Sequence, residues 1–153
     1  MELRVYLETT VISYLTALPS RDIVQAAHQQ VTREWWERRN RFDLFVSEAV
    51  LEEAARGDTG AAARRLAALE GIPVLEVGAE VSRLADQLVG SSTIPPIDAV
   101  HIAVSVVNGM HYLLTWNSAH IANAALRGKI EDTCRDVGLL PPIICTPEEL
   151  LED

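Results

Sequence analysis

The stretch that decides the fold is Leu3-Arg4-Val5-Tyr6-Leu7-Glu8-Thr9-Thr10-Val11-Ile12, near the start of the chain. Residues 3–7 are mostly strand formers, and a helical pattern of apolar residues begins at Val11. A carboxylate, Glu8, and two hydroxyls stand between strand and helix. In open α/β sheets, ligands bind where the carboxyl ends of strands turn into helices. Glu8 is therefore either a ligand for a metal or substrate, or a residue that only adds charge to the first helical turn.

The rest of the chain alternates between strand and helix patterns. We expect further strands at 42–47, 73–77, 112–115 and 141–145, and helices at 11–17, 21–41, 48–56, 59–69, 79–89, 99–107, 119–126, 129–137 and from Thr146 onward. This alternation predicts a three-layer α/β/α fold with a central parallel sheet of four to five strands. No internal repeat or linker interrupts it, so residues 1–153 are expected to form a single domain.

Length and composition are those of an ordinary globular domain. The chain has 153 residues, 48% of them hydrophobic and 23% charged, which suffices for a full core. No apolar run reaches the roughly 18 residues of a membrane span, and the first residues lack a signal-peptide pattern. The two cysteines are too few for a disulfide framework or a cysteine zinc site. We therefore expect a cytoplasmic protein with reduced thiols and no membrane association.

The negative net charge and the scarcity of lysine argue against several classes of function. A net charge of −9 argues against binding nucleic acid by charge alone, but not against an enzyme that acts on it through metal ions. Lys129 is the only lysine, and the sequence contains no GxxxxGK[ST] phosphate loop. A phosphoacceptor signalling domain would also place acids at strand ends. It needs a lysine after a late strand, which is missing, so this hypothesis ranks last.

Four polar positions fall at strand-to-helix junctions or in first helical turns: Glu8, Glu52 or Glu53, Asp98 and Asn117. The ends of parallel strands meet at one edge of a sheet, so these side chains can converge. Clustered carboxylates repel one another unless a cation lies between them, and hard oxygen ligands suit Mg²⁺ or Mn²⁺. One or two such ions could activate water and hold the oxygens of a phosphodiester during in-line displacement.

Each of these positions also has a purely structural interpretation. Asp98 could stabilise the positive end of its helix, Glu53 could be solvated, and Asn117 is typical of turns. His101 follows one helical turn after Asp98 and either contacts the site or packs with one hydrogen-bond partner. A zinc site built on His101 and His120 would need additional nearby ligands, and the sequence indicates none.

Four segments resemble, in order, the motifs of PIN domains, a family of metal-dependent nucleases that includes the VapC-type toxins of bacterial toxin–antitoxin pairs. They are residues 6–12 (YLETTVI), 46–53 (VSEAVLEE), 98–103 (DAVHIA) and 113–117 (LLTWN). The resemblance covers nearly the whole chain. It selects Glu53 over Glu52, because the acid of the second motif lies six residues after the serine.

The resemblance implies a metal-dependent endoribonuclease in which Glu8, Glu53 and Asp98 bind Mg²⁺ or Mn²⁺. It places Asn117 as the residue that orients a water, and three further side chains could support the ligands from outside: Thr9, Thr115 and His101. It also implies an RNA substrate, a homodimer and a VapB-like antitoxin whose tail reaches the acidic cleft. An arginine from such a partner would pair well with carboxylates.

Two positions depart from the family pattern. Glu8 replaces the usual aspartate, and its extra methylene moves the carboxylate by roughly 1 Å or more. Mg²⁺ demands near-ideal octahedral geometry, so Mn²⁺ is expected to be tolerated better. Asn117 replaces the fourth acid and could offer a carbonyl oxygen or hold a water without adding charge. These departures favour one metal ion over two, and they support an alternative: a PIN-like module that has lost catalysis and serves in binding or assembly.

Overall fold

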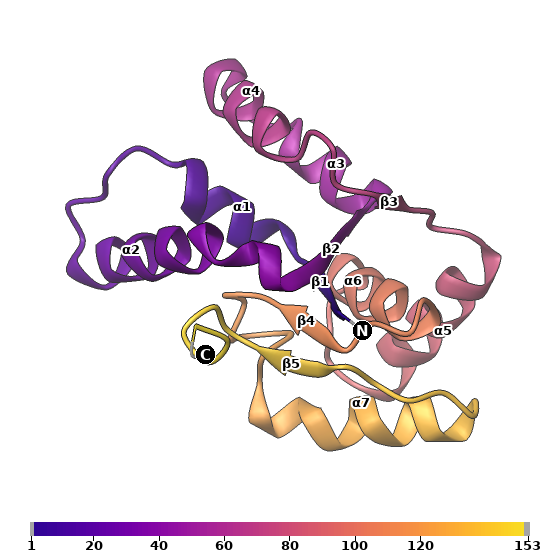
Figure 1. Cartoon of the computed structure of the whole chain (residues 1–153). Helices are drawn as coiled ribbons and strands as arrows, with labels where there is room; N and C mark the ends of the chain where they lie inside the picture. Colours follow the sequence, from indigo (N-terminus) through magenta and orange to yellow (C-terminus); the bar gives the residue numbers. More distant parts are fainter. Residues whose placement is uncertain (1, 152–153) are drawn as a thin grey trace.

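The computed structural model of the chain describes residues 2–151. Its centre is a five-stranded parallel sheet in the order β3-β2-β1-β4-β5 (Figure 1). The strands are β1 (Leu3–Leu7), β2 (Phe42–Ser47), β3 (Val74–Leu75), β4 (Tyr112–Leu114) and β5 (Ile143–Cys145). The helices are α1 (Thr9–Thr16), α2 (Ile23–Glu37), the 3-10 turn η1 (Arg39–Arg41), α3 (Glu48–Ala54), α4 (Thr59–Ala68), α5 (Ala79–Ser91), α6 (Pro96–Val107) and α7 (Ala124–Asp136).

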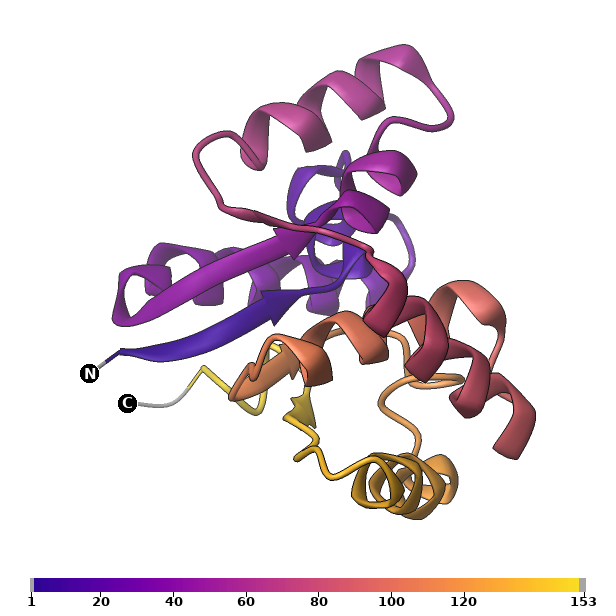
Figure 2. The same ribbon diagram turned by 90° about the vertical axis from the view of Figure 1, so that its right-hand side faces the viewer.

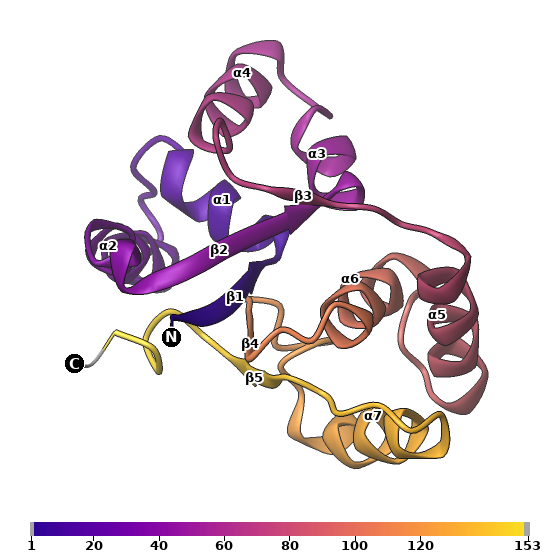
Figure 3. The same ribbon diagram turned by 45° about the vertical axis from the view of Figure 1, so that its right-hand side comes forward.

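The helices form a layer on each side of the sheet. Helices α1 to α4 pack against one another, and α5 packs against both α6 and α7. Figure 3 shows the first group on one side of the strands and the second group on the other. The predicted three-layer α/β/α fold with a parallel sheet of four to five strands is therefore confirmed. Within residues 2–151, no helix is both long enough and apolar enough to cross a membrane.

Strand β1 is the middle strand of the sheet, with β2 on one side and β4 on the other. Val5, Tyr6 and Leu7 are completely buried, as expected for a strand covered on both faces. Tyr6 pairs with Phe45 of β2, and Leu7 pairs with Leu114 of β4. Figure 2 shows β1 and β2 side by side with their arrowheads at the same end. The side chains that follow these strands therefore emerge at one edge.

The second helix is shorter than the sequence pattern predicted. A single helix was expected over 21–41, but α2 ends at Glu37 and a 3-10 turn follows it. The N-cap is Asp22, whose side chain accepts a hydrogen bond from the Gln25 backbone N–H at 2.9 Å. Ser20 lies before the helix and donates its hydroxyl to the Gln25 side chain.

Two predictions about the last third of the chain were wrong. Two helices were expected over 119–126 and 129–137, but α7 runs through Gly128 without a break. Glycine in a helix costs only about 1 kcal/mol, and burial of Ile130 and Cys134 on the same helix offsets that cost. Near the end of the chain, Thr146 and Glu149 form the reciprocal hydrogen bonds of a capping box. They close only a turn over 147–150, and residues 152–153 lie outside the described part.

Candidate active site

Glu8 lies directly after β1 and caps the first helix. Its backbone N–H donates to the Leu114 carbonyl at 3.0 Å, which ties it to the end of β4. The Glu8 side chain is only 3% exposed, and its Oε1 accepts hydrogen bonds from the hydroxyls of Thr10 (2.6 Å) and Thr115 (2.5 Å). Its Oε2 accepts one longer bond, from the Thr10 backbone N–H at 3.2 Å. Glu8 is thus held rigidly, with one oxygen less occupied than the other.

Glu53 lies near the end of α3 and turns toward Glu8. Its Oε1 accepts a hydrogen bond from the Thr9 hydroxyl at 2.5 Å. The same oxygen lies 2.6 Å from His101 Nε2. Burial raises the pKa of Glu53, but the hydrogen bonds from His101 and Thr9 outweigh it and leave the pKa below its ordinary value. Glu53 is therefore ionised at neutral pH. The adjacent Glu52 is exposed and pairs with Arg56 at the surface.

Asp98 lies in the first turn of α6, on the other side of Glu8. Pro96 opens this helix, and the Asp98 residue is 9% exposed. Burial raises the pKa of Asp98 above its ordinary value, and the charges of His120 and His101 offset only part of that rise. A carboxyl in this position gains more than an exposed one from a neighbouring cation.

Asn117 donates its side-chain Nδ2 hydrogen to Asp98 Oδ1 at 3.2 Å. Its Oδ1 accepts the backbone N–H of His120 at 3.0 Å, which fixes the orientation of the amide. The backbone N–H of Asn117 donates to the Thr115 hydroxyl at 2.9 Å. The amide oxygen is therefore turned toward the His120 backbone, and Asn117 contacts Asp98 through a hydrogen bond.

Behind Glu53, a buried chain of polar groups runs into the core. His101 Nδ1 lies 2.7 Å from the Tyr6 hydroxyl, which lies 2.8 Å from the Ser47 hydroxyl. His101, Tyr6 and Ser47 are all completely buried. Burial raises the pKa of the Tyr6 phenol far above its ordinary value. These groups connect β1, the end of β2 and α6 to the carboxylate of α3.

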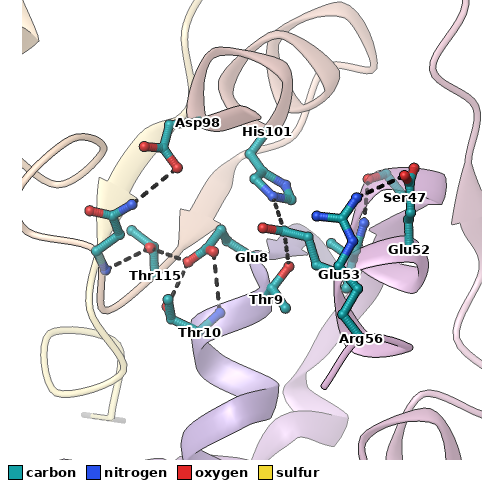
Figure 4. A network of polar contacts seen from close by, with 12 residues as sticks. Glu8, Thr9, Thr10, Ser47, Glu52, Glu53, Arg56, Asp98, His101 and Thr115 are labelled. Atoms are coloured by element: carbon teal, nitrogen blue, oxygen red, sulfur yellow. Dashed lines mark hydrogen bonds and ion pairs between the residues drawn. The ribbon is translucent and has the colours of Figure 1, made fainter. Parts of the chain in front are cut away.

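The structure brings all the predicted site residues to one edge of the sheet, but it divides them into two groups. Glu8, Glu53 and His101 each offer a ligand atom, and these atoms lie within 4.8 Å of one another. Asp98 is outside that group and pairs with Asn117. Figure 4 shows Glu8 between Asp98 and Thr115 on one side and Glu53 and His101 on the other.

The donor set fits a hard divalent cation. Within residues 2–151, no hydrogen bond reaches Glu53 Oε2 or Asp98 Oδ2, and Glu8 Oε2 accepts only one. Two oxygens that bind the same Mg²⁺ lie up to about 4.2 Å apart, since each bond is about 2.1 Å. The ligand atoms of Glu8, Glu53 and His101 lie within 4.8 Å of one another, so a small shift of the side chains would bring the two carboxylates within that limit. Carboxylate oxygens are the ligands that Mg²⁺ and Mn²⁺ prefer.

Three residues of the network were missed from sequence: Tyr6, Thr10 and Ser47. A tyrosine in a strand buried on both faces needs a hydrogen-bond partner, and that rule could have drawn attention to Tyr6. Ser47 could have been recognised as the N-cap of α3, where its side chain accepts the Val50 backbone N–H. Thr10 follows Glu8 by two residues, a spacing typical of local hydroxyl bonds.

A comparison with models of known protein families identifies the family of this chain. The family model of the PIN domain matches residues 5–129. The chain belongs to the PIN domain family. No functionally curated protein sequence matches this PIN domain chain.

Two solved structures share the PIN fold of this chain. One is VapC20 of Mycobacterium tuberculosis, described as a sarcin–ricin loop cleaving toxin, with a TM-score of 0.60 and 20% identity, covering 75% of this chain and 91% of that one. The other is VapBC2 of Rickettsia felis bound to a DNA fragment from its promoter, with a TM-score of 0.57 and 12% identity. It covers 94% of this chain and 98% of that one. At these identities the likeness shows the fold.

Proposed function

We propose that this PIN domain is a metal-dependent endoribonuclease of the VapC toxin type. The observation that carries the proposal is that Glu8, Glu53 and Asp98 all lie at the carboxyl edge of the sheet. Each of these side chains has one carboxylate oxygen that accepts at most one hydrogen bond. A divalent ion bound there would activate water and stabilise negative charge during hydrolysis of an RNA phosphodiester. We assign these three residues as its ligands and Mg²⁺ or Mn²⁺ as the ion.

Hydrogen bonds from neighbouring side chains hold two of the proposed ligands in place before an ion binds. Thr10 and Thr115 fix Glu8, while Thr9 and His101 fix Glu53, so the ligands lose little further freedom when an ion binds. In this proposal Glu8, whose Oε1 is held by the hydroxyls of Thr10 and Thr115, serves as a ligand in place of the aspartate of the family pattern.

Asn117 supports a single metal ion. Its amide oxygen accepts the His120 N–H, and its Nδ2 holds Asp98. This arrangement supplies no fourth carboxylate, so the charge of the site matches one divalent ion better than two. Asn117 acts in the proposal by orienting Asp98.

We also propose an RNA substrate, a VapB-like antitoxin and a homodimer in the cytoplasm. The support is the family together with the fold shared with VapC20 and VapBC2. Both cysteines are free and buried, which is compatible with a reducing compartment. A monomeric mass in light scattering at micromolar concentration would contradict the homodimer.

The test of the nuclease proposal is cleavage of a mixed RNA substrate by the purified chain. We expect cutting in Mn²⁺, weaker cutting in Mg²⁺ and none in EDTA. Asp98→Ala should abolish cutting while leaving the circular dichroism spectrum unchanged. Cutting that persists in EDTA would refute the metal-dependent mechanism.

The neutral Asn117 supports one other candidate, a binding or assembly module without catalysis. A folded protein that cuts no RNA in either metal would favour this candidate. Glu8→Asp would then be the variant to test, because it restores the shorter carboxylate of the family pattern.

A further inference from the structure

We propose that Tyr14, His28 and Trp116 form a stacking platform for an unpaired base of the RNA substrate, next to the metal site. The inference rests on the proposed function and names a part of the substrate that the protein recognises. The three rings come from α1, α2 and the segment that follows β4. Helices α1 and α2 pack against each other and lie side by side in Figure 1.

The three aromatic rings contact one another. His28 is stacked on Trp116, with ring centroids 4.0 Å apart and an angle of 14° between the ring planes. Tyr14 meets both rings nearly edge-on, with its centroid 5.5 Å from that of His28 and 6.0 Å from that of Trp116. Each of the three residues is partly exposed, so the cluster is not sealed inside the core. Aromatic rings open to solvent are the surfaces on which unpaired RNA bases stack.

Trp116 connects the aromatic cluster to the metal site. It directly follows Thr115, whose hydroxyl bonds to Glu8. The Trp116 backbone N–H donates to the Thr10 hydroxyl at 2.9 Å, and that hydroxyl bonds to the same carboxylate. The ring nitrogen of Trp116 donates to the Thr32 hydroxyl at 2.8 Å, which fixes the orientation of the ring. A base bound to the cluster is therefore held in a fixed position relative to Glu8.

Stacking holds the His28 ring in this cluster. Its Nδ1 is shielded from solvent and has no hydrogen-bond partner within residues 2–151. The ring instead contacts Tyr14 and Trp116. Buried polar atoms normally have a hydrogen-bond partner, and a histidine placed for its hydrogen bonds would use this nitrogen. The contribution of His28 is therefore its flat ring, which extends the stacking surface of Trp116.

Tyr14 also lines a hollow between α1 and α2. The hollow has a volume of about 410 Å³, which lies within the range of small-ligand sites. Ser13, Ser20 and Gln25 line it as well. Hydroxyl and amide groups hydrogen-bond the edges of a base, whereas an aromatic ring contacts its face. The hollow thus offers both kinds of contact beside one ring of the platform.

The charge of the chain favours stacking as the source of RNA affinity. The net charge is −9, so the protein gains little from the phosphate contacts that dominate binding by basic proteins. Stacking does not depend on charge, because every base has a flat π face. It also tolerates different bases. The platform therefore selects an unpaired base without requiring a particular sequence.

The first test measures binding of two fluorescein-labelled single-stranded oligomers to the full chain, by anisotropy in EDTA at low salt. One is an adenylate decamer, and the other has the same length and charge but lacks the bases. We expect the wild type to bind the decamer at least about tenfold more tightly than the abasic oligomer. Tyr14→Leu and His28→Leu should each weaken decamer binding about tenfold. Tyr14→Phe keeps the ring and should bind like the wild type.

Tryptophan fluorescence, measured with unlabelled decamer, locates the bound base. Trp35 is completely buried, and the guanidinium of Arg39 lies 4.4 Å from the ring centroid of Trp36. We expect the decamer to quench fluorescence in the wild type and in Trp36→Leu, but not in Trp116→Leu. Trp36→Leu is also the matched control for affinity, which it should leave unchanged. If circular dichroism shows that Trp116→Leu does not fold, the comparison of Tyr14→Leu with Tyr14→Phe decides.

The outcomes separate this inference from the proposed function. A wild type that binds both oligomers equally, or binds neither, would overturn the platform, and so would Tyr14→Leu binding the decamer like the wild type. Base-dependent binding by a protein that cuts no RNA in Mn²⁺ would refute the nuclease and leave the platform in place. In an active protein, Tyr14→Leu should raise KM about tenfold with kcat unchanged, whereas Asp98→Ala abolishes kcat.

Discussion

Thr115→Val isolates the support of Glu8 because valine keeps the shape of threonine and removes only the hydroxyl. Thr115 is completely buried, and its hydroxyl donates to the carboxylate of Glu8 at 2.5 Å. A hydrogen bond to a charged group contributes about 1.5–3 kcal/mol. The Asn117 backbone N–H also loses its acceptor, which adds about 1 kcal/mol. We expect the free energy of unfolding to fall by about 3 kcal/mol in total.

The assay is urea unfolding followed by circular dichroism, first in EDTA and then in Mn²⁺. An ion at 100 times its dissociation constant stabilises the wild type by about 2.7 kcal/mol. If loss of the Thr115 hydroxyl weakens Mn²⁺ binding about tenfold, the same concentration stabilises the variant by only about 1.4 kcal/mol. The variant is therefore less stable in EDTA and gains less from the metal.

Thr133→Val is the matched control. Thr133 is also buried, but its hydroxyl bonds to the Lys129 carbonyl and to Ser91, both neutral groups, on α7 and α5. We expect a loss of about 1 kcal/mol and an unchanged response to Mn²⁺. If Thr115→Val lost no more stability than Thr133→Val, or gained as much from Mn²⁺ as the wild type, the assigned support of Glu8 would be wrong.

Three further predictions follow from particular residues. Asp98→Asn should raise the melting temperature of the metal-free protein at pH 7, because burial disfavours the charged carboxylate, and should abolish stabilisation by Mn²⁺; a lower melting temperature in EDTA would contradict this. The folded pKa of Glu53 is lowered from 4.5, so its contribution to stability is present above pH 4.5 and is lost as pH falls through the folded value. Urea unfolding of wild type and Glu53→Gln should therefore converge in acid, and a constant difference across that range would refute it. Gly128→Ala should stabilise α7 by about 0.5–1 kcal/mol in thermal unfolding, because an added Cβ meets nothing within 4 Å; a destabilised variant would show that the helix is broken there.

The sequence predicted the fold and the location of the site because both depend on chain order. Alternating strands and helices require parallel pairing, and parallel pairing brings the residues after Leu7 and Leu114 to one edge. Glu8 and Thr115 therefore meet, although they are far apart in the chain. The ends of helices were less predictable. Burial of neighbouring residues stabilises α7 across Gly128, where the sequence pattern indicated a break.

The pairing of side chains within the site could not be predicted in the same way. Spacing on α6 places Asp98 and His101 on one face, yet Asp98 contacts Asn117 while His101 contacts Glu53. That division depends on side-chain conformations and on the packing of α6 against α3. The hydrogen bonds of Tyr6 depend on the same packing, because its partners Ser47 and His101 come from separate elements.

The most direct test of the account compares RNA cleavage by Glu53→Gln and Glu52→Gln in Mn²⁺. The two residues are adjacent on α3, but Glu53 faces Glu8 and His101 whereas Glu52 pairs with Arg56 at the surface. The account predicts that Glu53→Gln lowers the cleavage rate at least about 100-fold and that Glu52→Gln cleaves like the wild type. Equal rates for the two variants, or a loss confined to Glu52→Gln, would contradict the assignment of this carboxylate cluster as the catalytic metal site.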